Sequence, residues 1–201
     1  IGTGAASSTD YLNTGWQTNI PSSFTISFWT KDFGLTPTLY YIFGDVSASS
    51  FRCFTNGVAG ANNWILRGTG ITDTYINGGA TAEPHMCTFV YDATLGNIKG
   101  YLDGVLVTTV AQAGTPVING SGPFKVMGYG SNVGAPLNGK IDEFRLYTRA
   151  LSAAEVLALN NTTTYSTITE TACDSYTAPS GTVYTASGTY NDTIVNVNGC
   201  D

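Results

Sequence analysis

Charged side chains are scarce in this sequence. Only 11% of the residues are Asp, Glu, Lys or Arg, against about a quarter in an average soluble protein. The eight basic residues are scattered and the net charge is −6, so no basic patch exists that could neutralise nucleic-acid phosphates. We therefore expect no nucleic-acid partner. A surface built instead from Gly, Thr, Ser and Asn is typical of an extracellular protein.

Long apolar runs are also lacking. No segment approaches the roughly 18 consecutive apolar residues that a membrane-spanning helix needs. The sequence begins at Ile1, without the charged and apolar regions of a signal peptide. These features predict a mature, exported protein that does not insert into a membrane.

The four cysteines show no C-x-x-C spacing, which argues against zinc or redox chemistry. Three disulfide pairings are possible. We favour Cys53 with Cys87 and Cys173 with Cys200, because each pair lies within one expected domain and the protein is expected outside the cell. Two buried free thiols are the alternative for Cys53 and Cys87.

Short runs of alternating residues, separated by Gly, Pro, Asn and Asp, fill residues 24–130 and predict an all-β sandwich. They are FTISFWTK, YYIFGD, FRCFTN, NWILRG, HMCTFVYD, IKGYL, VLVTTV and FKVMGYG. Asp103 and Gly104 lie between two of these runs and form the pair that two-residue hairpin turns favour. In FTISFWTK we expect one face to be packed between the sheets and the other to be partly open.

Residues 139–156, GKIDEFRLYTRALSAAEV, predict a strand followed by a capped helix. Strict alternation from Ile141 to Tyr147 would place Asp142 on the same face as Phe144 and Leu146. Ser152 and Glu155 have the spacing of a capping box, and Leu151 and Val156 that of a hydrophobic staple. We expect a helix of about two turns, ending near residue 160.

This run resembles the closing signature of laminin-G-like, concanavalin-A-like domains, "G-x-I-D-E-x-R-[IL]-Y" followed by "[RN]-A-L-S-x-x-E". The segments DYL, SFTISFWTK, HMCTFVYD and GYLDGVLV follow in the family's order. The resemblance implies a two-sheet antiparallel jelly-roll sandwich over residues 1–161, with one short C-terminal helix. The family often has a histidine pair before the "FVYD" strand, whereas His85 stands alone here, and we favour packing as its role.

Residues 162–201 differ in composition, since they are rich in Thr, Tyr and Ser and lack Lys and Arg. They resemble repeats found in large secreted surface proteins of certain Gram-negative bacteria. The resemblance implies a small β-rich appendage closed by a disulfide, without its last strand. Exposed strands near Val183, Ile194 and Val195 would then allow the chain to assemble with copies of itself.

The carboxylate pairs of glycan-cleaving enzymes are missing. A retaining glycosidase needs two carboxyl groups about 5–5.5 Å apart. None of the four Glu residues has a second carboxyl residue at the required spacing on its strand. They are Glu83, Glu143, Glu155 and Glu170. Asp142 and Glu143 are adjacent, so on a strand they would point to opposite faces. We expect no catalysis.

Asp142, if it lies on an apolar face, needs partners. It could accept backbone N–H bonds or pair with Arg145 or Arg149. The other interpretation is a structural Ca²⁺ bound by Asp142 and backbone carbonyls, with Asp10 as a further ligand. Several domains of this superfamily place a calcium ion between the first and last strands.

Sugar-binding modules use exposed aromatic rings with a few amides and carboxylates. The candidates are Trp64, Asp73, Tyr75, Tyr129 and Asn132, and Asp73 and Tyr75 are expected in a loop. We conclude that the chain is a non-catalytic adhesion or recognition module of a secreted or cell-surface bacterial protein, binding a glycan or a surface protein. The alternative is a structural subunit of a surface fibre that binds mainly its own neighbours.

Overall fold

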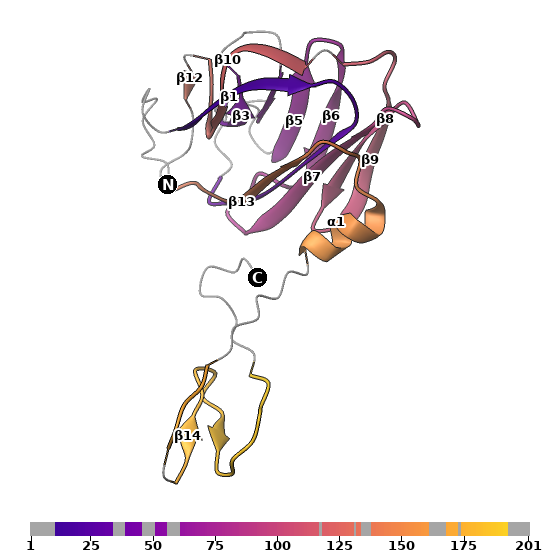
Figure 1. Cartoon of the computed structure of the whole chain (residues 1–201). Helices are drawn as coiled ribbons and strands as arrows, with labels where there is room; N and C mark the ends of the chain where they lie inside the picture. Colours follow the sequence, from indigo (N-terminus) through magenta and orange to yellow (C-terminus); the bar gives the residue numbers. More distant parts are fainter. Residues whose placement is uncertain are drawn as a thin grey trace. The chain divides into compact units, whose positions relative to one another are not determined.

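The computed structural model describes residues 11–33, 39–45, 51–55, 61–116, 118–130, 132–133, 138–160, 168–172 and 174–192. The chain divides into two compact units, Ile1–Asn160 and Asn161–Asp201. The described residues of the first unit form strands and one helix, whose arrangement Figure 1 shows. Within the described part, no helix is long and apolar enough to cross a membrane.

Two antiparallel sheets form the first unit, which confirms the predicted sandwich. The six-stranded sheet has the order β1-β10-β3-β4-β5-β6, with bounds Leu12–Ile20 (β1), Ile118–Val126 (β10), Tyr41–Gly44 (β3), Phe51–Phe54 (β4), Asn63–Gly68 (β5) and Ile71–Asn77 (β6). The five-stranded sheet has the order β13-β2-β7-β8-β9, with bounds Lys140–Tyr147 (β13), Phe24–Lys31 (β2), His85–Asp92 (β7), Asn97–Leu102 (β8) and Val105–Ala111 (β9). A short pair, Gly128–Tyr129 (β11) and Asn132–Val133 (β12), lies beside β3 and β10.

Aromatic side chains dominate the core between the sheets. The Phe28 ring contacts Phe43 and Trp64 edge to face, with centroids 6.1 and 6.2 Å apart. Strand β2 lies between β13 and β7, and both of its faces are buried, contrary to the partly open face that we predicted. Its outer face is covered in part by the segment before the helix, since the Thr25 hydroxyl bonds the Arg149 carbonyl and the Leu151 N–H.

A bulge in β13 overturns the prediction that Asp142 lies on an apolar face. The register with β2 shifts between Asp142 and Arg145, and Glu143 has a φ of 50°. Because the bulge breaks the alternation, Ile141 packs against the core together with Phe144 and Leu146. Asp142 is exposed, and its Oδ1 accepts the N–H of Glu143 at 2.8 Å.

The predicted hairpin between β8 and β9 is confirmed, with φ values of 49° at Asp103 and 79° at Gly104. The Asp103 carboxylate also ties the hairpin to β7, accepting the Met86 N–H at 2.9 Å and lying 2.8 Å from His85 Nδ1. His85 therefore supports the turn, in keeping with the packing role predicted for it.

The predicted disulfide between Cys53 and Cys87 is not formed in the structure, where both residues are free thiols. They lie on opposite sheets, on β4 and β7, and both are fully buried in the core. Burial raises the pKa of each thiol well above its ordinary value, which keeps the thiols protonated and unreactive. Cys173 and Cys200 lie outside the described residues.

The capping box is confirmed at the start of helix α1 (Ala153–Asn160). The Ser152 hydroxyl accepts the Glu155 N–H, and Glu155 in turn accepts the Ser152 N–H at 2.8 Å. The staple residues Leu151 and Val156 are both buried. Arg149 Nη2 donates to Glu155 Oε1 at 2.7 Å, so the cap is also bonded to the segment between β13 and the helix.

Glu155 should make unfolding pH-dependent. Its hydrogen bonds, first with Arg149 and then with Ser152, lower its pKa from 4.5 to about 2. The stabilisation is therefore present above pH 4.5 and is lost as the pH falls toward 2. We expect the difference in melting temperature between the wild type and Glu155→Gln to shrink across this range. An unchanged difference would contradict the assignment.

In its described residues, 168–172 and 174–192, the second unit contains one short antiparallel pair, Tyr176–Thr177 (β14) and Val183–Tyr184 (β15). The rings of Tyr184 and Tyr190 stack with centroids 4.1 Å apart, and Asp192 accepts the Ser180 N–H at 3.2 Å. The Val183 side chain is exposed, and the open strand edge expected near it stays a prediction. Ile194 and Val195 lie outside the described residues.

Candidate functional site

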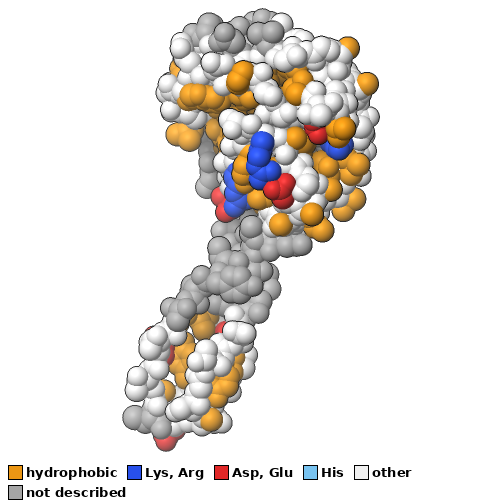
Figure 2. All heavy atoms as spheres, turned by 45° about the vertical axis from the view of Figure 1, so that its right-hand side comes forward, with side chains coloured by type: hydrophobic (Ala, Val, Ile, Leu, Met, Phe, Trp, Pro, Cys, Tyr) orange, Lys and Arg blue, Asp and Glu red, His pale blue; other side chains and the backbone are white. Residues whose placement is uncertain are grey.

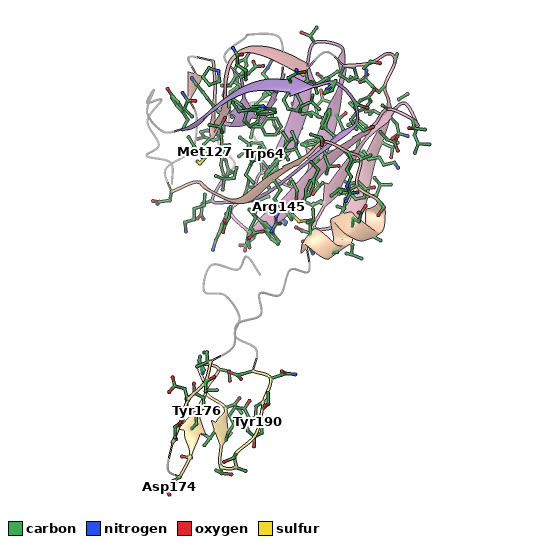
Figure 3. The ribbon with its side chains drawn as sticks, viewed as in Figure 1. Trp64, Met127, Arg145, Asp174, Tyr176 and Tyr190 are labelled. Atoms are coloured by element: carbon green, nitrogen blue, oxygen red, sulfur yellow. The ribbon has the colours of Figure 1, made fainter. Side chains whose placement is uncertain are left out.

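The structure separates the residues that the sequence grouped as glycan-binding candidates. Trp64 is fully buried in the core, so its selection as an exposed ligand residue was wrong, and Figure 3 shows it between the two sheets. Tyr129 is also buried, with 6% of its surface exposed. The side chain of Asn132 lies outside the described part. Asp73 and Tyr75 remain accessible, but on strand β6 and not in a loop.

Asp73 and Tyr75 belong to the outward face of three neighbouring strands, which we name the β4–β6 outer face. Phe51, Cys53, Trp64, Leu66 and Ile76 point into the core, so the residues that alternate with them point outward. The outward set is Arg52 and Phe54 on β4, Asn63, Ile65 and Arg67 on β5, and Asp73, Tyr75 and Asn77 on β6.

Two arginines and one aspartate form the charged part of this face. Arg52 and Arg67 are direct cross-strand partners, and both guanidinium groups lie over the ring of Phe54, at 5.6 and 5.1 Å from its centroid. Arg67 Nε donates to both oxygens of Asp73, at 2.8 and 3.0 Å, and Nη2 donates to Oδ2. The hydrogen bond with Asp73 is the main cause that raises the pKa of Arg67.

Aromatic rings extend the charged cluster toward β3 and β11. The Tyr129 ring stacks on Tyr41 with centroids 5.0 Å apart, and the Arg52 guanidinium lies 5.1 Å from the Tyr129 centroid. Tyr41 also contacts Phe54 at 5.7 Å. Burial raises the pKa of Tyr129, and Arg52 opposes this shift. The Tyr129 ring thus makes a cation–π contact with the Arg52 guanidinium.

An amide pair lies at the other end of the face. Asn63 and Asn77 are cross-strand partners. Asn63 is only 7% exposed, and its Oδ1 is buried without a hydrogen-bond partner. An unsatisfied buried acceptor is costly. Tyr75 is two residues from Asn77 on the same face, with 37% of its surface exposed.

Sequence reasoning missed Arg52, Arg67, Asn63 and Asn77. Alternation in FRCF and NWILRG already separates outward from inward positions, so Arg52, Asn63 and Arg67 could have been found by this signal. Strand β6 was harder to recognise, because ITDTYIN places polar Thr74 on the buried face beside Ile76.

Of the two side chains suggested as calcium ligands, the structure describes only Asp142. Asp142 is exposed at the bulge, and Asp10 lies outside the described part. The residues that the structure describes contain no group of three or more His, Cys, Asp or Glu side chains arranged to hold a metal ion. Calcium binding by Asp142 and backbone carbonyls stays a prediction.

Residues 6–157 match the family model described as the concanavalin A-like lectin/glucanases superfamily. The chain belongs to this superfamily. The assignment confirms the family resemblance and the jelly-roll fold. It does not fix a function, because members of one fold class carry out different functions. Among the curated proteins, none matches the chain.

Solved structures with similar folds include receptor-binding domains of clostridial toxins. The binding domain of Paraclostridial Mosquitocidal Protein 1 is 18% identical, with a TM-score of 0.56 over 75% of this chain and 39% of that one. The receptor-binding domain of the botulinum neurotoxin C/D mosaic serotype is 18% identical, with a TM-score of 0.54 over 70% of this chain and 36% of that one. The chain thus spans little more than a third of these structures, and at this identity they share its fold alone.

Proposed function

We propose that the chain is a non-catalytic, extracellular recognition module that binds a glycan through the β4–β6 outer face. The observation that carries this proposal is the accessible Tyr75 ring, beside the Asn63–Asn77 amide pair and the Arg67–Asp73 ion pair. An aromatic face with amide and charged groups around it is the usual chemistry of sugar recognition. The superfamily includes lectins, and cell entry of botulinum neurotoxin type C, one of the proteins with a similar structure, is dependent upon interaction with two ganglioside molecules.

A glycan array followed by titration calorimetry would test the proposal. Tyr75→Ala should weaken binding of any array hit about tenfold, because the stacking contact is lost. Leu95→Ala removes an exposed apolar side chain from the turn between β7 and β8, so it should leave the affinity unchanged. If no glycan binds, or if both variants bind like the wild type, the proposal is wrong.

A second candidate function, self-assembly as a subunit of a surface fibre, is favoured by strand β9. It is the edge of its sheet, carries no charged residue, and exposes Val105, Leu106 and Val107. Such an edge can pair with another strand, as can the predicted strands of the second unit. Light scattering on the whole chain and on residues 1–160, over a hundredfold concentration range, would show which unit assembles. Two monomeric proteins would exclude assembly.

We also propose a structural calcium ion at Asp142, whose exposed carboxylate is accessible to an ion. If calcium binds the folded state, EDTA should lower the melting temperature by removing that stabilisation. Asp142→Asn should lower it likewise and abolish the EDTA effect. A wild type that melts at one temperature with calcium and with EDTA would rule the ion out.

A further inference from the structure

Four strands form the edges of the two sheets, β1 and β6 in one and β13 and β9 in the other. Proteins protect such edges from other strands with charged side chains, bulges or covering groups. Strand β13 has four charged residues in its sequence KIDEFRLY and a bulge against β2. Strand β6 carries Asp73, and Gln112 Oε1 accepts the Thr72 N–H at 2.8 Å. These two edges are therefore protected.

Strand β1 is uncharged, and an irregular backbone protects it. Its register with β10 shifts twice. Between the paired ends of β1, Asn13 Oδ1 accepts the Gly15 N–H at 2.9 Å, and Thr14 Oγ1 accepts the Trp16 N–H at 3.2 Å. Each residue has one backbone N–H, so these two donors are already bonded within the strand. A long, regular pairing along β1 is thus disfavoured.

Strand β9 is the least protected of the four edges. It carries no charged residue, and among the strands that the structure describes it pairs only with β8. Its register with β8 shifts once, between Leu106 and Thr108, and residues 108–111 pair regularly. Val105, Leu106 and Val107 are 62, 48 and 46% exposed. An uncharged edge with exposed apolar side chains favours the addition of another strand.

The apolar surface continues from β9 onto helix α1. A Cβ at Gly104 would lie 2.8 Å from Leu157 Cδ1, so Leu157 lies against the turn that precedes β9. Its side chain is exposed. Figure 2 brings forward the side on which Figure 1 labels β8, β9 and α1, and it shows charged side chains as a few small groups among apolar and uncharged atoms. A strand that adds to β9 therefore meets a largely uncharged border.

The side chains of β9 indicate which kind of strand fits beside it. A charged side chain in the added strand would be taken from water without gaining a partner of opposite charge on β9, which is unfavourable. Val, Thr and Leu side chains instead make favourable cross-strand pairs. Strand β9 of a second copy meets this requirement, because VLVTTVA paired antiparallel with itself opposes only Val, Leu, Thr and Ala. Every molecule of the chain carries this strand.

We propose that two copies of the chain pair through β9, antiparallel to each other, so that their five-stranded sheets join across a two-fold axis. Such a contact uses the same surface of both copies and closes, whereas a fibre needs a contact that does not close. The inference develops the self-assembly candidate described above and changes its symmetry. It does not depend on glycan binding.

The two-fold symmetry has a consequence for the β4–β6 outer face. The axis between two neighbouring antiparallel strands of one sheet runs perpendicular to that sheet, so both copies keep the same side of the sandwich uppermost. The β4–β6 outer faces of the two copies then lie on the same side of the dimer. If this face binds a glycan as proposed, the dimer can bind two glycans on one surface, which raises the overall affinity without a new contact.

Sedimentation equilibrium of the full chain over a hundredfold concentration range tests the stoichiometry. We expect a reversible equilibrium between monomer and dimer, without larger species. Species that keep growing with concentration would overturn the closed dimer and leave the fibre candidate standing. A chain that stays monomeric would overturn both and would make a strand of another protein the partner that β9 fits.

Charged variants test whether the contact lies at β9. Val107→Lys and Val107→Glu should each raise the Kd of the dimer about tenfold, because the dimer contains the like charge twice on its paired strands. Leu95→Lys is the matched control, since Leu95 is 61% exposed in the turn between β7 and β8. It should leave the Kd unchanged. Equal Kd values for all variants and the wild type would overturn the proposal.

Mixing the two charged variants tests the two-fold symmetry. Val107 is one residue from the middle of β9, so when two such strands overlap fully it lies about 7–8 Å from its counterpart, as in a diagonal pair. An equimolar mixture of Val107→Lys and Val107→Glu should therefore dimerise more tightly than either variant alone. A mixture that binds no more tightly would contradict the two-fold contact.

Hydrogen exchange tests the same contact without any substitution. In the wild type, amide exchange along β9 should slow as the protein concentration rises, because the second copy bonds the exposed strand edge. Exchange along β1 should stay unchanged and serves as the internal control. Exchange at β9 that does not respond while dimers form would place the contact elsewhere and overturn the proposal. Melting temperatures equal to that of the wild type show that the variants are folded.

Discussion

Replacing Trp64 by alanine should lower the free energy of unfolding by about 3–5 kcal/mol, the usual cost of removing a large buried aromatic side chain. Trp64 is fully buried, and it contacts Phe33 and Phe28 edge to face, with centroids 5.0 and 6.2 Å apart. The substitution would leave a cavity where the two sheets meet. Chemical denaturation in urea, followed by circular dichroism, measures the change.

Two further variants sharpen this test. The indole N–H of Trp64 is buried without a hydrogen-bond partner, so Trp64→Phe loses volume but also removes an unsatisfied donor, and it should cost less than Trp64→Ala. Tyr75→Ala changes an accessible ring on the outer face and should alter stability by no more than about 0.5 kcal/mol. A Trp64→Ala variant as stable as Tyr75→Ala would contradict the burial of Trp64.

Local chemistry explains the parts of the fold that could be predicted from the sequence. The hairpin at Asp103-Gly104 requires two residues that accept positive φ, and the pair itself supplies them. The helix start depends on Ser152 and Glu155, which are only three residues apart and bond each other. Short alternating runs predicted most strands because each run carries its own pattern of apolar residues.

The errors concern features that depend on distant partners. In β13, the bulge at Glu143 appears only in the register with β2, and it reverses the side on which Asp142 lies. The residue type of Trp64 does not distinguish a position in the core from a position in a sugar-binding site, because aromatic rings are common in both. Trp64 is buried because it packs against the rings of Phe28 and Phe33, which come from another part of the chain.

The candidate site was only half predictable for the same reason. Asp73 and Tyr75 were recognised by residue type, whereas Arg67 became relevant only because β5 and β6 pair and bring it to Asp73. Arg52 lies one strand further along, and its position opposite Arg67 follows from the register of β4 and β5. Pairing of strands, rather than any motif, assembles the outer face.

Gly79 lies in a closely packed part of the core, and Gly79→Ala should lower the free energy of unfolding by about 1–3 kcal/mol, as overpacking does. A Cβ at this position would lie 2.5 Å from Cys87 Sγ and 3.0 Å from Trp64 Cδ1. Both neighbours are buried, so neither can move into solvent, and the packed interior must shift instead.

The free thiol of Cys87 makes this crowding testable with a double-mutant cycle. Cys87→Ala removes the Sγ that the new methyl group would meet, so Gly79→Ala/Cys87→Ala should be less destabilised than the sum of the two single variants. For groups in contact we expect a coupling of about 0.5–3 kcal/mol. A disulfide with Cys53 would give a different result, because Cys87→Ala alone would then cost about 2–5 kcal/mol and reduction would destabilise the wild type. Additive effects in the cycle, or a wild type weakened by reductant in its first unit, would contradict the free, closely packed thiol seen at Cys87.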